Sequence, residues 1–209
     1  YSLNENFKNY FNNYDFHNLY KELLNFCTVD LSAFYFDIRK DSLYCDSKDS
    51  EKRKSTIILL NIILKSLLKW FAPILSFTTE EIYRLIMNNE KSIHLTKFLD
   101  FPKSFKNENL NQKWLGLIKI RNVCNISIEE KRASKYIGSS LEAELEINLD
   151  NKFLEITKGI DFSELCITSK AKILYKNNLE IDVKTLKAKG SKCPICWKIS
   201  EQACNRHSE

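Results

Sequence analysis

Apolar residues recur every three or four positions over much of the chain, and the clearest stripe begins at Phe16. Residues at this spacing share one face of a helix, so the stripe predicts a core-facing helix of about six turns. Asp30 and Asp37 lie beside it, and we expect them to pair with a base on a neighbouring helix rather than to act as catalytic acids. The stripe consists of Phe16, Leu19, Tyr20, Leu23, Leu24, Cys27, Leu31, Phe34, Tyr35 and Ile38.

The segment from Ile57 to Phe71 is apolar almost all round, which predicts a helix at the buried centre of a bundle. Residues 41–55 before it are polar and read as a loop or a helix entry, and Pro73 ends the helix. A further helix is expected from Thr78, which can cap it while Glu81 reaches back in a capping box.

Another helix is predicted from about Asn111 to Lys135, and Arg121 falls on its apolar face. A charge in that position needs a partner. Asp30 or Asp37 would serve, and an RNA phosphate is the alternative. The other residues of this face are Trp114, Leu117, Ile118, Cys124 and Ile128.

The hydrophobic period changes to two after Gly138, which predicts short strands. Between the last two, Lys176-Asn177-Asn178 is expected to form a hairpin turn, because Asn tolerates positive φ. The fold class is therefore mainly α, with a helical bundle (1–137), a small α/β or β domain (138–187) and a tail (188–209). The alternation covers Leu141 to Leu149, Leu165 to Ile167, Ile173 to Tyr175 and Leu179 to Val183.

The tail carries two ligand pairs at equal spacing, Cys193 with Cys196 and Cys204 with His207. Three thiolates and an imidazole suit one tetrahedral zinc ion, whose binding would have to supply the folding energy of so short a segment. The alternatives are scattered cysteines or a Cys-x-x-Cys redox pair, but no thioredoxin-like strand precedes Cys193.

Composition narrows the function classes. The net charge of +5 suits a polyanionic partner without requiring one, and seven cysteines, an odd number, favour a reducing compartment, the cytosol. No apolar run predicts a membrane span or a signal peptide, and the lack of an initiating Met suggests a piece of something longer. Neither a dinucleotide fingerprint nor a phosphate loop can be written around the widely spaced glycines, Gly116, Gly138, Gly159 and Gly190.

Several blocks, in order along nearly the whole chain, resemble bacterial isoleucyl-tRNA synthetases. The first two resemble the anticodon-binding helices of that family, the next a helix junction, the fourth its helix-to-sheet passage and the last its C-terminal zinc finger. These blocks are His17 to Tyr20, Cys27 to Tyr44, Ala72 to Glu81, Lys135 to Ala143 and Lys192 to Trp197.

The resemblance implies a module that grips the anticodon stem and loop of an isoleucine-accepting tRNA, in a cytoplasmic, monomeric enzyme. The signature sequences of class I synthetases are absent, so the catalytic and editing domains, which use ATP to ligate isoleucine to tRNA, are expected elsewhere in the parent chain. The family usually closes its zinc site with a second Cys-x-x-Cys, whereas His207 takes the last position here. Candidate tRNA contacts are Arg39, Lys40, Arg121, Lys192, Trp197, Lys198 and Arg206.

Three other readings stay open at this point. The chain could be a free-standing zinc protein acting on nucleic acid, although the Tyr1-Ser2 start lacks the catalytic Pro-Glu of the DNA glycosylases that end in a similar finger. It could be a helical interaction domain with a structural zinc. It could also be the same region of a valyl or leucyl sibling enzyme.

Overall fold

The computed structural model describes residues 1–87, 91–177, 180–204 and 206–207. Its contacts divide the chain into two compact units, Tyr1–Asn107 and Glu108–Glu209. The fold is mainly α with a small mixed sheet, which confirms the predicted class. The predicted domain limits stay a prediction, and the contact division differs from them because the helix from Glu108 packs on the sheet that follows it.

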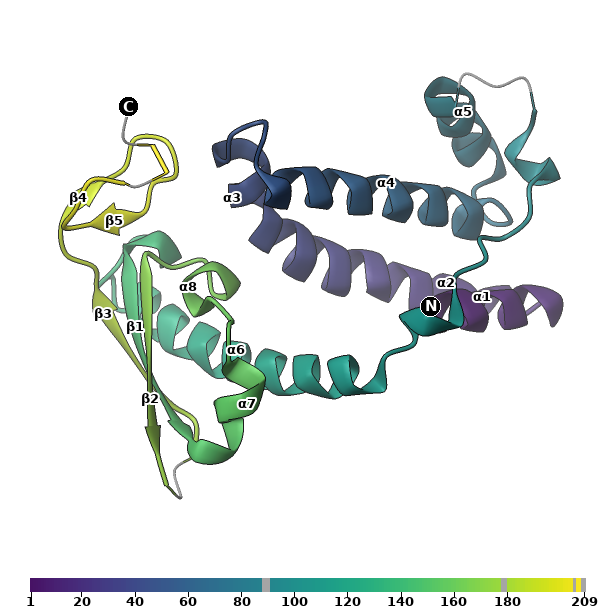
Figure 1. Ribbon diagram of the computed structural model, residues 1–209. Helices are drawn as coiled ribbons and strands as arrows, with labels where there is room; N and C mark the ends of the chain where they lie inside the picture. The colour runs from purple at the N-terminus through teal and green to yellow at the C-terminus, as the bar shows by residue number, and fades with distance from the viewer. Residues whose placement is uncertain (88–90, 178–179, 205, 208–209) are drawn as a thin grey trace. The chain divides into compact units, whose positions relative to one another are not determined.

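The first unit is helical (Figure 1). Asp15 caps α2 by accepting a hydrogen bond from the Asn18 amide, and Ser50 caps α4 by accepting one from Arg53. Its elements are α1 (Ser2–Asn12), α2 (Phe16–Asn25), the π-helix η1 (Phe26–Phe36), α3 (Asp37–Cys45), α4 (Glu51–Phe71), α5 (Ser76–Met87) and the 3₁₀ helices η2 (Ile93–Leu95) and η3 (Lys103–Phe105).

Helices α2, η1 and α3 follow one another without a break, so the predicted helix exists and extends to Cys45. Residues 41–45, expected to be loop or helix entry, are therefore helical. The predicted stripe divides along its length: Leu19 and Leu23 are buried, whereas Tyr20 and Leu24 are 48% and 43% exposed. A stripe with both three- and four-residue steps is wider than the surface that the neighbouring helices cover.

Aromatic packing closes the core between α1, α2 and α4. Phe7 meets Trp70 edge to face, with ring centroids 5.0 Å apart, and both pack with Leu19 and Leu23. The indole N–H of Trp70 donates to Oδ1 of the buried Asn4, 3.0 Å away, so the polar end of the ring is satisfied inside the core.

The expectation that α4 lies wholly buried is wrong for its first half. Ile57, Ile58, Leu59 and Ile62 are 40–63% exposed, while Leu68 and Trp70 in the second half are buried. In the described part of the chain, α4 makes its main contacts with α3 and α5, which leave one side of its N-terminal half uncovered.

The predicted capping box at Thr78 is also wrong, because α5 begins at Ser76 and Thr78 lies inside it. Glu80, the residue before Glu81, makes a longer-range contact instead. Its Oε2 accepts hydrogen bonds from Ser92 Oγ at 2.8 Å and from the Ile93 amide at 2.9 Å. These contacts fasten η2 to α5.

The second unit begins with α6 and continues with a three-stranded sheet in the order β2-β1-β3 (Figure 1). Strand β1 pairs in parallel with β2 and antiparallel with β3. The elements are α6 (Glu108–Ala133), η4 (Ser140–Glu142), β1 (Ala143–Asp150), η5 (Asn151–Phe153), α7 (Leu154–Thr157), α8 (Phe162–Leu165), β2 (Lys170–Lys176), β3 (Asp182–Lys187), β4 (Ser191–Lys192) and β5 (Ile199–Ser200).

Two strand-level predictions fail in this unit. Leu165 ends α8, and Ile167 has φ +56° in the turn that follows, so no strand forms there. Strands β2 and β3 are not a hairpin, because β1 lies between them and pairs with both. Of the predicted turn, Asn178 lies outside the described residues, as does the neighbouring Leu179.

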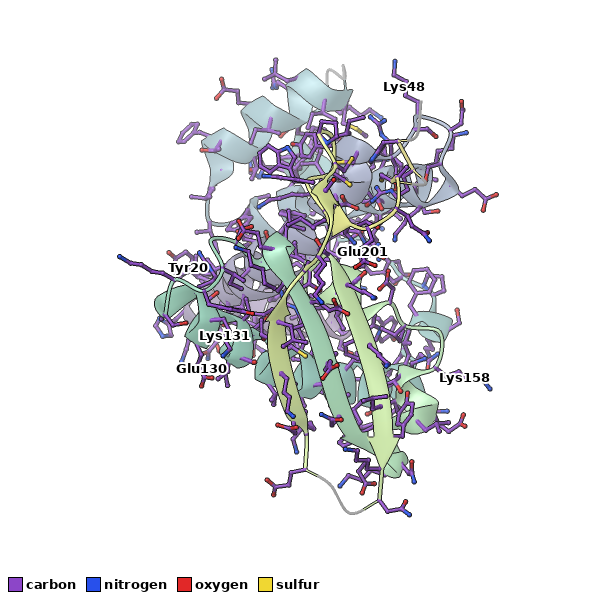
Figure 2. All side chains as sticks on the ribbon, turned by 90° about the vertical axis from the view of Figure 1, so that its left-hand side faces the viewer. Tyr20, Lys48, Glu130, Lys131, Lys158 and Glu201 are labelled. Carbon is purple, nitrogen blue, oxygen red and sulfur yellow. The ribbon has the colours of Figure 1, made fainter. Side chains whose placement is uncertain are left out.

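The two faces of this sheet differ in chemistry. Leu145, Ile147 and the other alternate residues of β1 are buried, and Ser127 of α6 hydrogen-bonds the Thr185 hydroxyl at 2.8 Å. Figure 2 looks onto the three strands. In the register of the sheet, Glu144 and Glu146 of β1 lie opposite Lys170 and Lys172 of β2. One of these register pairs forms a salt bridge, between Lys170 and Glu144 at 3.3 Å.

None of the described helices combines the length and the apolar composition that crossing a membrane requires.

Candidate functional site

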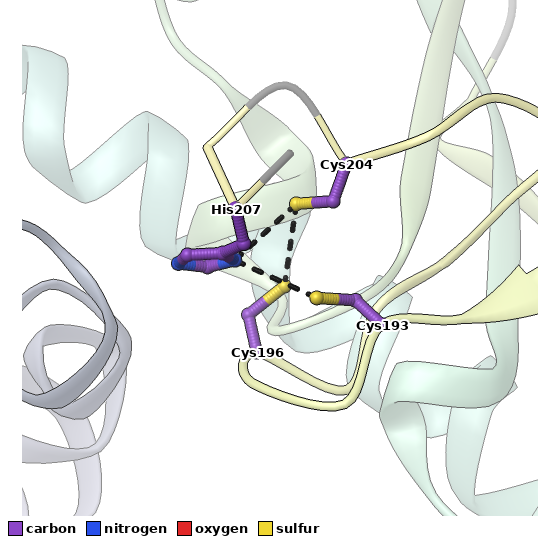
Figure 3. A group of neighbouring side chains, drawn as sticks. All are labelled: Cys193, Cys196, Cys204 and His207. Carbon is purple, nitrogen blue, oxygen red and sulfur yellow. Dashed lines mark hydrogen bonds between the residues drawn. The ribbon is translucent and has the colours of Figure 1, made fainter. Parts of the chain in front are cut away.

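The structure brings the four predicted ligands of the tail together. Their ligand atoms all lie within 4.8 Å of one another (Figure 3). Nδ1 of His207 lies 3.3 Å from Cys204 Sγ and 3.5 Å from Cys193 Sγ, and the Cys196 and Cys204 sulfurs are 3.9 Å apart. Cys193 and Cys196 are buried, the other two half-buried. Such a group could hold a metal ion.

Local backbone geometry positions the first pair. Cys193 donates its amide to the Lys198 carbonyl at 2.9 Å, and Trp197 donates to the Cys193 carbonyl at 3.0 Å, which closes the turn. Trp197 adopts φ +63°, a conformation rare for a bulky residue. We infer that the closed turn holds it there.

Gly190 makes the close approach of strands β4 and β5 possible. It has φ +116°, and a Cβ at this position would lie 2.1 Å from the Ser200 carbonyl oxygen. No side chain fits so close to backbone, so the start of the hairpin requires glycine.

The two thiols of the turn differ in acidity. Amide hydrogen bonds from Cys196 and Ile195 lower the pKa of Cys193 to about 6. Burial raises the pKa of Cys196 to about 11, with the Cys193 and Cys204 sulfurs acting in the same direction. The lowered pKa favours the thiolate form of Cys193 at neutral pH, whereas Cys196 would ionise only with a cation beside it.

The tail is fastened to the sheet unit behind it. The Ile199 amide donates to Ser169 Oγ at 2.6 Å, and Ser169 in turn hydrogen-bonds the Leu141 carbonyl. Lys198 Nζ donates to Ser163 Oγ at 3.4 Å. Against the opposing effect of burial, hydrogen bonds from Ser163 lower the pKa of Asp161, and the Lys198 charge acts in the same direction. Lys198, a predicted tRNA contact, thus faces α8. No pattern in the sequence indicated that Ser163 or Ser169 would hold the tail.

Lys192 and Trp197, two other predicted tRNA contacts in the tail, lie next to each other on the surface. Lys192 Nζ stands 4.9 Å from the centroid of the Trp197 ring, and Trp197 is 58% exposed. Ile195 beside them is also exposed, and so is Arg206. The tip of the tail therefore presents an aromatic face with a cation over it.

The candidates in the first unit lie where η1 passes into α3. The guanidinium carbon of Arg39 lies over the Tyr35 ring, 5.9 Å from its centroid. Lys40 pairs with Asp37 at 3.0 Å and remains 64% exposed. Both side chains keep local contacts, and their roles toward RNA stay predictions.

Arg121 has a partner that the sequence did not indicate. Its Nε donates to the Leu165 carbonyl at 2.9 Å, so the guanidinium caps the end of α8. We expected Asp30 or Asp37 to pair with Arg121, but this bond goes to a carbonyl group, and Asp37 pairs with Lys40. A carbonyl contact between residues 44 positions apart leaves no trace in sequence spacing.

The family model for the anticodon-binding domain of tRNA ligase matches residues 1–147, more than half of the chain. This match covers the helical unit and continues through α6 into β1. It implies tRNA binding.

The curated relatives are isoleucine–tRNA ligases. The one from Pelagibacter ubique is 67% identical over 209 residues, covering 100% of this chain and 23% of the relative. The ligase from Agrobacterium fabrum is 37% identical over 198 residues, covering 90% of this chain and 20% of the relative. The ligase from Rhodopseudomonas palustris is 39% identical over 202 residues, covering 89% of this chain and 20% of the relative.

The chain thus spans between a fifth and a quarter of the length of these relatives. Its matches run along the whole sequence, from the helices to the Cys/His tail, and confirm the resemblance seen in the sequence blocks. The chain belongs to the anticodon-binding-domain family of tRNA ligases and matches the C-terminal region of bacterial isoleucyl-tRNA synthetases.

Proposed function

We propose that this chain binds the anticodon stem and loop of an isoleucine-accepting tRNA, as part of an enzyme that ligates isoleucine to that tRNA with ATP. The match of residues 1–147 to the anticodon-binding domain carries the proposal. The catalytic and editing steps belong to other domains of the parent enzyme, which would act as a monomer in the cytoplasm.

We further propose that the tail holds one structural zinc ion. With Zn–S near 2.3 Å and Zn–N near 2.0–2.1 Å, a tetrahedral site has ligand-to-ligand edges of about 3.5–3.8 Å. The sulfur and nitrogen contacts of 3.3, 3.5 and 3.9 Å are close to these values. Three cysteines and one histidine form a donor set that zinc prefers. The ion would order the tail, which has little apolar core of its own.

In this scheme the basic side chains hold phosphates and the exposed ring reads bases. Lys192 and Arg206 would supply affinity that falls with salt. Trp197 would stack on an unstacked anticodon base. Lys198 contributes mainly to the attachment of the tail, because its ammonium group faces Ser163.

The first test compares binding of the zinc-loaded chain to an isoleucine tRNA and to the same tRNA with a replaced anticodon, at one near-physiological salt concentration. We expect a preference of at least about tenfold, equivalent to about 1.4 kcal/mol. Equal binding to both would leave a basic fold that holds RNA without reading it, and would favour a purely structural metal.

Trp197→Ala then tests the stacking role. Base stacking contributes about 1–3 kcal/mol by alanine substitution, so affinity should fall roughly 5- to 150-fold. Ile195→Ala, an exposed neighbour without an aromatic ring, is the matched control and should bind normally. Lys192→Ala should lower the salt slope, whereas Lys172→Ala on the charge-balanced sheet face should not.

A further inference from the structure

Four aromatic side chains form a row on the surface of the first unit. Tyr14 meets Phe16 with ring centroids 6.3 Å apart, and Phe16 meets Phe11 at 6.2 Å. Phe11 in turn meets Phe98, from the segment after η2, at 5.4 Å. All three pairs are edge to face, so in each pair the two faces of one ring are not covered by the other ring. The row is accessible, since Tyr14, Phe11 and Phe16 are 81%, 40% and 37% exposed.

The backbone at Tyr14 favours glycine rather than an aromatic residue. Helix α1 ends in a Schellman motif, closed by a 2.8 Å hydrogen bond from the Asp15 amide to the Tyr10 carbonyl. Glycine is usual where Tyr14 stands in this motif, and a φ of +56° is rare for a bulky residue. Trp197 in the tail also combines a positive φ with high exposure. A costly backbone conformation that presents a ring to solvent points to a binding role.

Two hollows adjoin the Phe98 end of the row. The smaller has a volume of about 120 Å³, and its walls include Phe11, Phe98 and the buried Ile93. An engineered apolar cavity of about 150 Å³ takes up benzene, so this hollow suits a single ring. The larger, of about 400 Å³, has a polar lining around Phe98, formed by Lys8, Asn12, Lys97 and Asp100. A ligand with a flat ring and a polar, charged part therefore fits this end of the row.

The charges at this end favour an anionic ligand. Lys97 is exposed, and Lys69, which lines the smaller hollow, donates its Nζ to the Lys97 carbonyl at 2.5 Å. The two nearest acidic residues are already engaged. Asp100 pairs with Lys8 at 3.3 Å, and Asp15 caps α2. The ammonium groups of Lys69 and Lys97 are thus available to a phosphate.

We propose that the row from Tyr14 to Phe98 is an RNA-binding surface that takes unpaired nucleotides. Bases would stack on the exposed rings, and phosphates would lie near Lys69 and Lys97. Aromatic faces beside cations bind single-stranded RNA, because every base has a face that can stack and every linkage carries a charge. The row lies in the first unit, whereas the Cys/His tail lies in the second. It would give the tRNA a further contact, and in this respect the inference rests on the proposed function.

Photo-cross-linking tests the site without a tRNA. The zinc-loaded chain is irradiated with a short oligouridylate that contains 4-thiouridine, then digested with ribonuclease and trypsin. We expect cross-links on residues 9–21, which carry Tyr14, and on residues 98–103, which begin with Phe98. Residues 193–198, which carry Trp197, report on the tail in the same digest.

The pattern of cross-links distinguishes this inference from the proposed function. Cross-links on the row support the inference even if the chain shows no preference for the isoleucine anticodon. Cross-links confined to residues 193–198 would overturn the inference and leave the proposed role of the tail intact.

Tyr14→Gly separates a binding role from a structural one. It removes the ring and supplies the residue that a φ of +56° favours, so the melting temperature should be no lower. Affinity for the oligouridylate should fall at least about fivefold, which corresponds to the loss of one stacked base. Tyr20→Ala, at an exposed tyrosine of α2 outside the row, should bind like the unchanged chain. Unchanged affinity of Tyr14→Gly would overturn the proposal.

Discussion

The helical unit and the Cys/His tail are held together in different ways. The helical unit buries large side chains such as Phe7, Leu23 and Trp70 over long helices. The tail (188–209) has two-residue strands, a group of four Cys/His ligand atoms that could hold a metal ion, and a few hydrogen bonds to the sheet unit. We therefore expect the helical unit to depend on the packing of many side chains and the tail to depend on a few ligand atoms.

The largest expected effect follows from removing one ligand of the tail. In small zinc-binding peptides metal binding provides about 10–16 kcal/mol, and it is the folding free energy. Cys196→Ser, or chelation of the metal, should therefore unfold the tail and leave the helical content unchanged. Trypsin should then cleave rapidly after Lys192 and Lys198, while circular dichroism stays constant.

Cys45→Ser is the matched control, because Cys45 is half-buried and lies in the other unit. The tail of the Cys45→Ser variant should remain protected from trypsin. Protection of the tail in the metal-free protein would mean that packing alone orders it, and the contrast between the two regions would disappear.

In the helical unit the next largest effect comes from a cavity. Leu23 is 0% exposed, so Leu23→Ala should lower the free energy of unfolding of that unit by about 2–5 kcal/mol. Ile58→Ala removes an apolar side chain that is 63% exposed and should cost less than about 0.5 kcal/mol. Urea unfolding followed by tryptophan fluorescence measures both, and similar losses would show that the outer side of α4 is covered in solution.

A smaller effect is expected at Gly190, where backbone rather than packing is tested. Gly190→Ala places a Cβ 2.1 Å from the Ser200 carbonyl oxygen at φ +116°. The strain of such a conformation alone is on the order of 1–3 kcal/mol, the backbone clash adds to it, and the sum should appear as weaker zinc affinity in a competition titration. Gly159→Ala is a useful control, since its φ is +75° but nothing lies near its Cβ.

The smallest effect concerns Glu80 and pH. Its hydrogen bond with Arg84, and those from Ile93 and Ser92, lower the pKa of the Glu80 carboxyl in the folded state. The stability that this group contributes is therefore present above its unfolded pKa, near 4.5, and is lost as pH falls through the lower folded value. Glu80→Gln should flatten the decline of melting temperature in that acidic window, and an unchanged profile would contradict the role assigned to Glu80.

The sequence by itself determined the features that depend on near neighbours. Three- and four-residue spacing predicted the helix from Phe16, and the paired spacing of Cys193, Cys196, Cys204 and His207 predicted the group that the structure brings together. The fold class and the family were also predicted from blocks of sequence. For the helix and for the Cys/His group the interacting residues lie close together in sequence, so the pattern contains the contact.

Only the tertiary structure decided which surfaces and partners these elements meet. It placed β1 between β2 and β3, left Ile58 exposed, and turned Arg121 toward the Leu165 carbonyl and Lys198 toward Ser163. These outcomes depend on backbone groups and helix faces that meet across tens of residues. A side chain's own sequence neighbours do not encode which of several possible partners is nearest once the chain has folded.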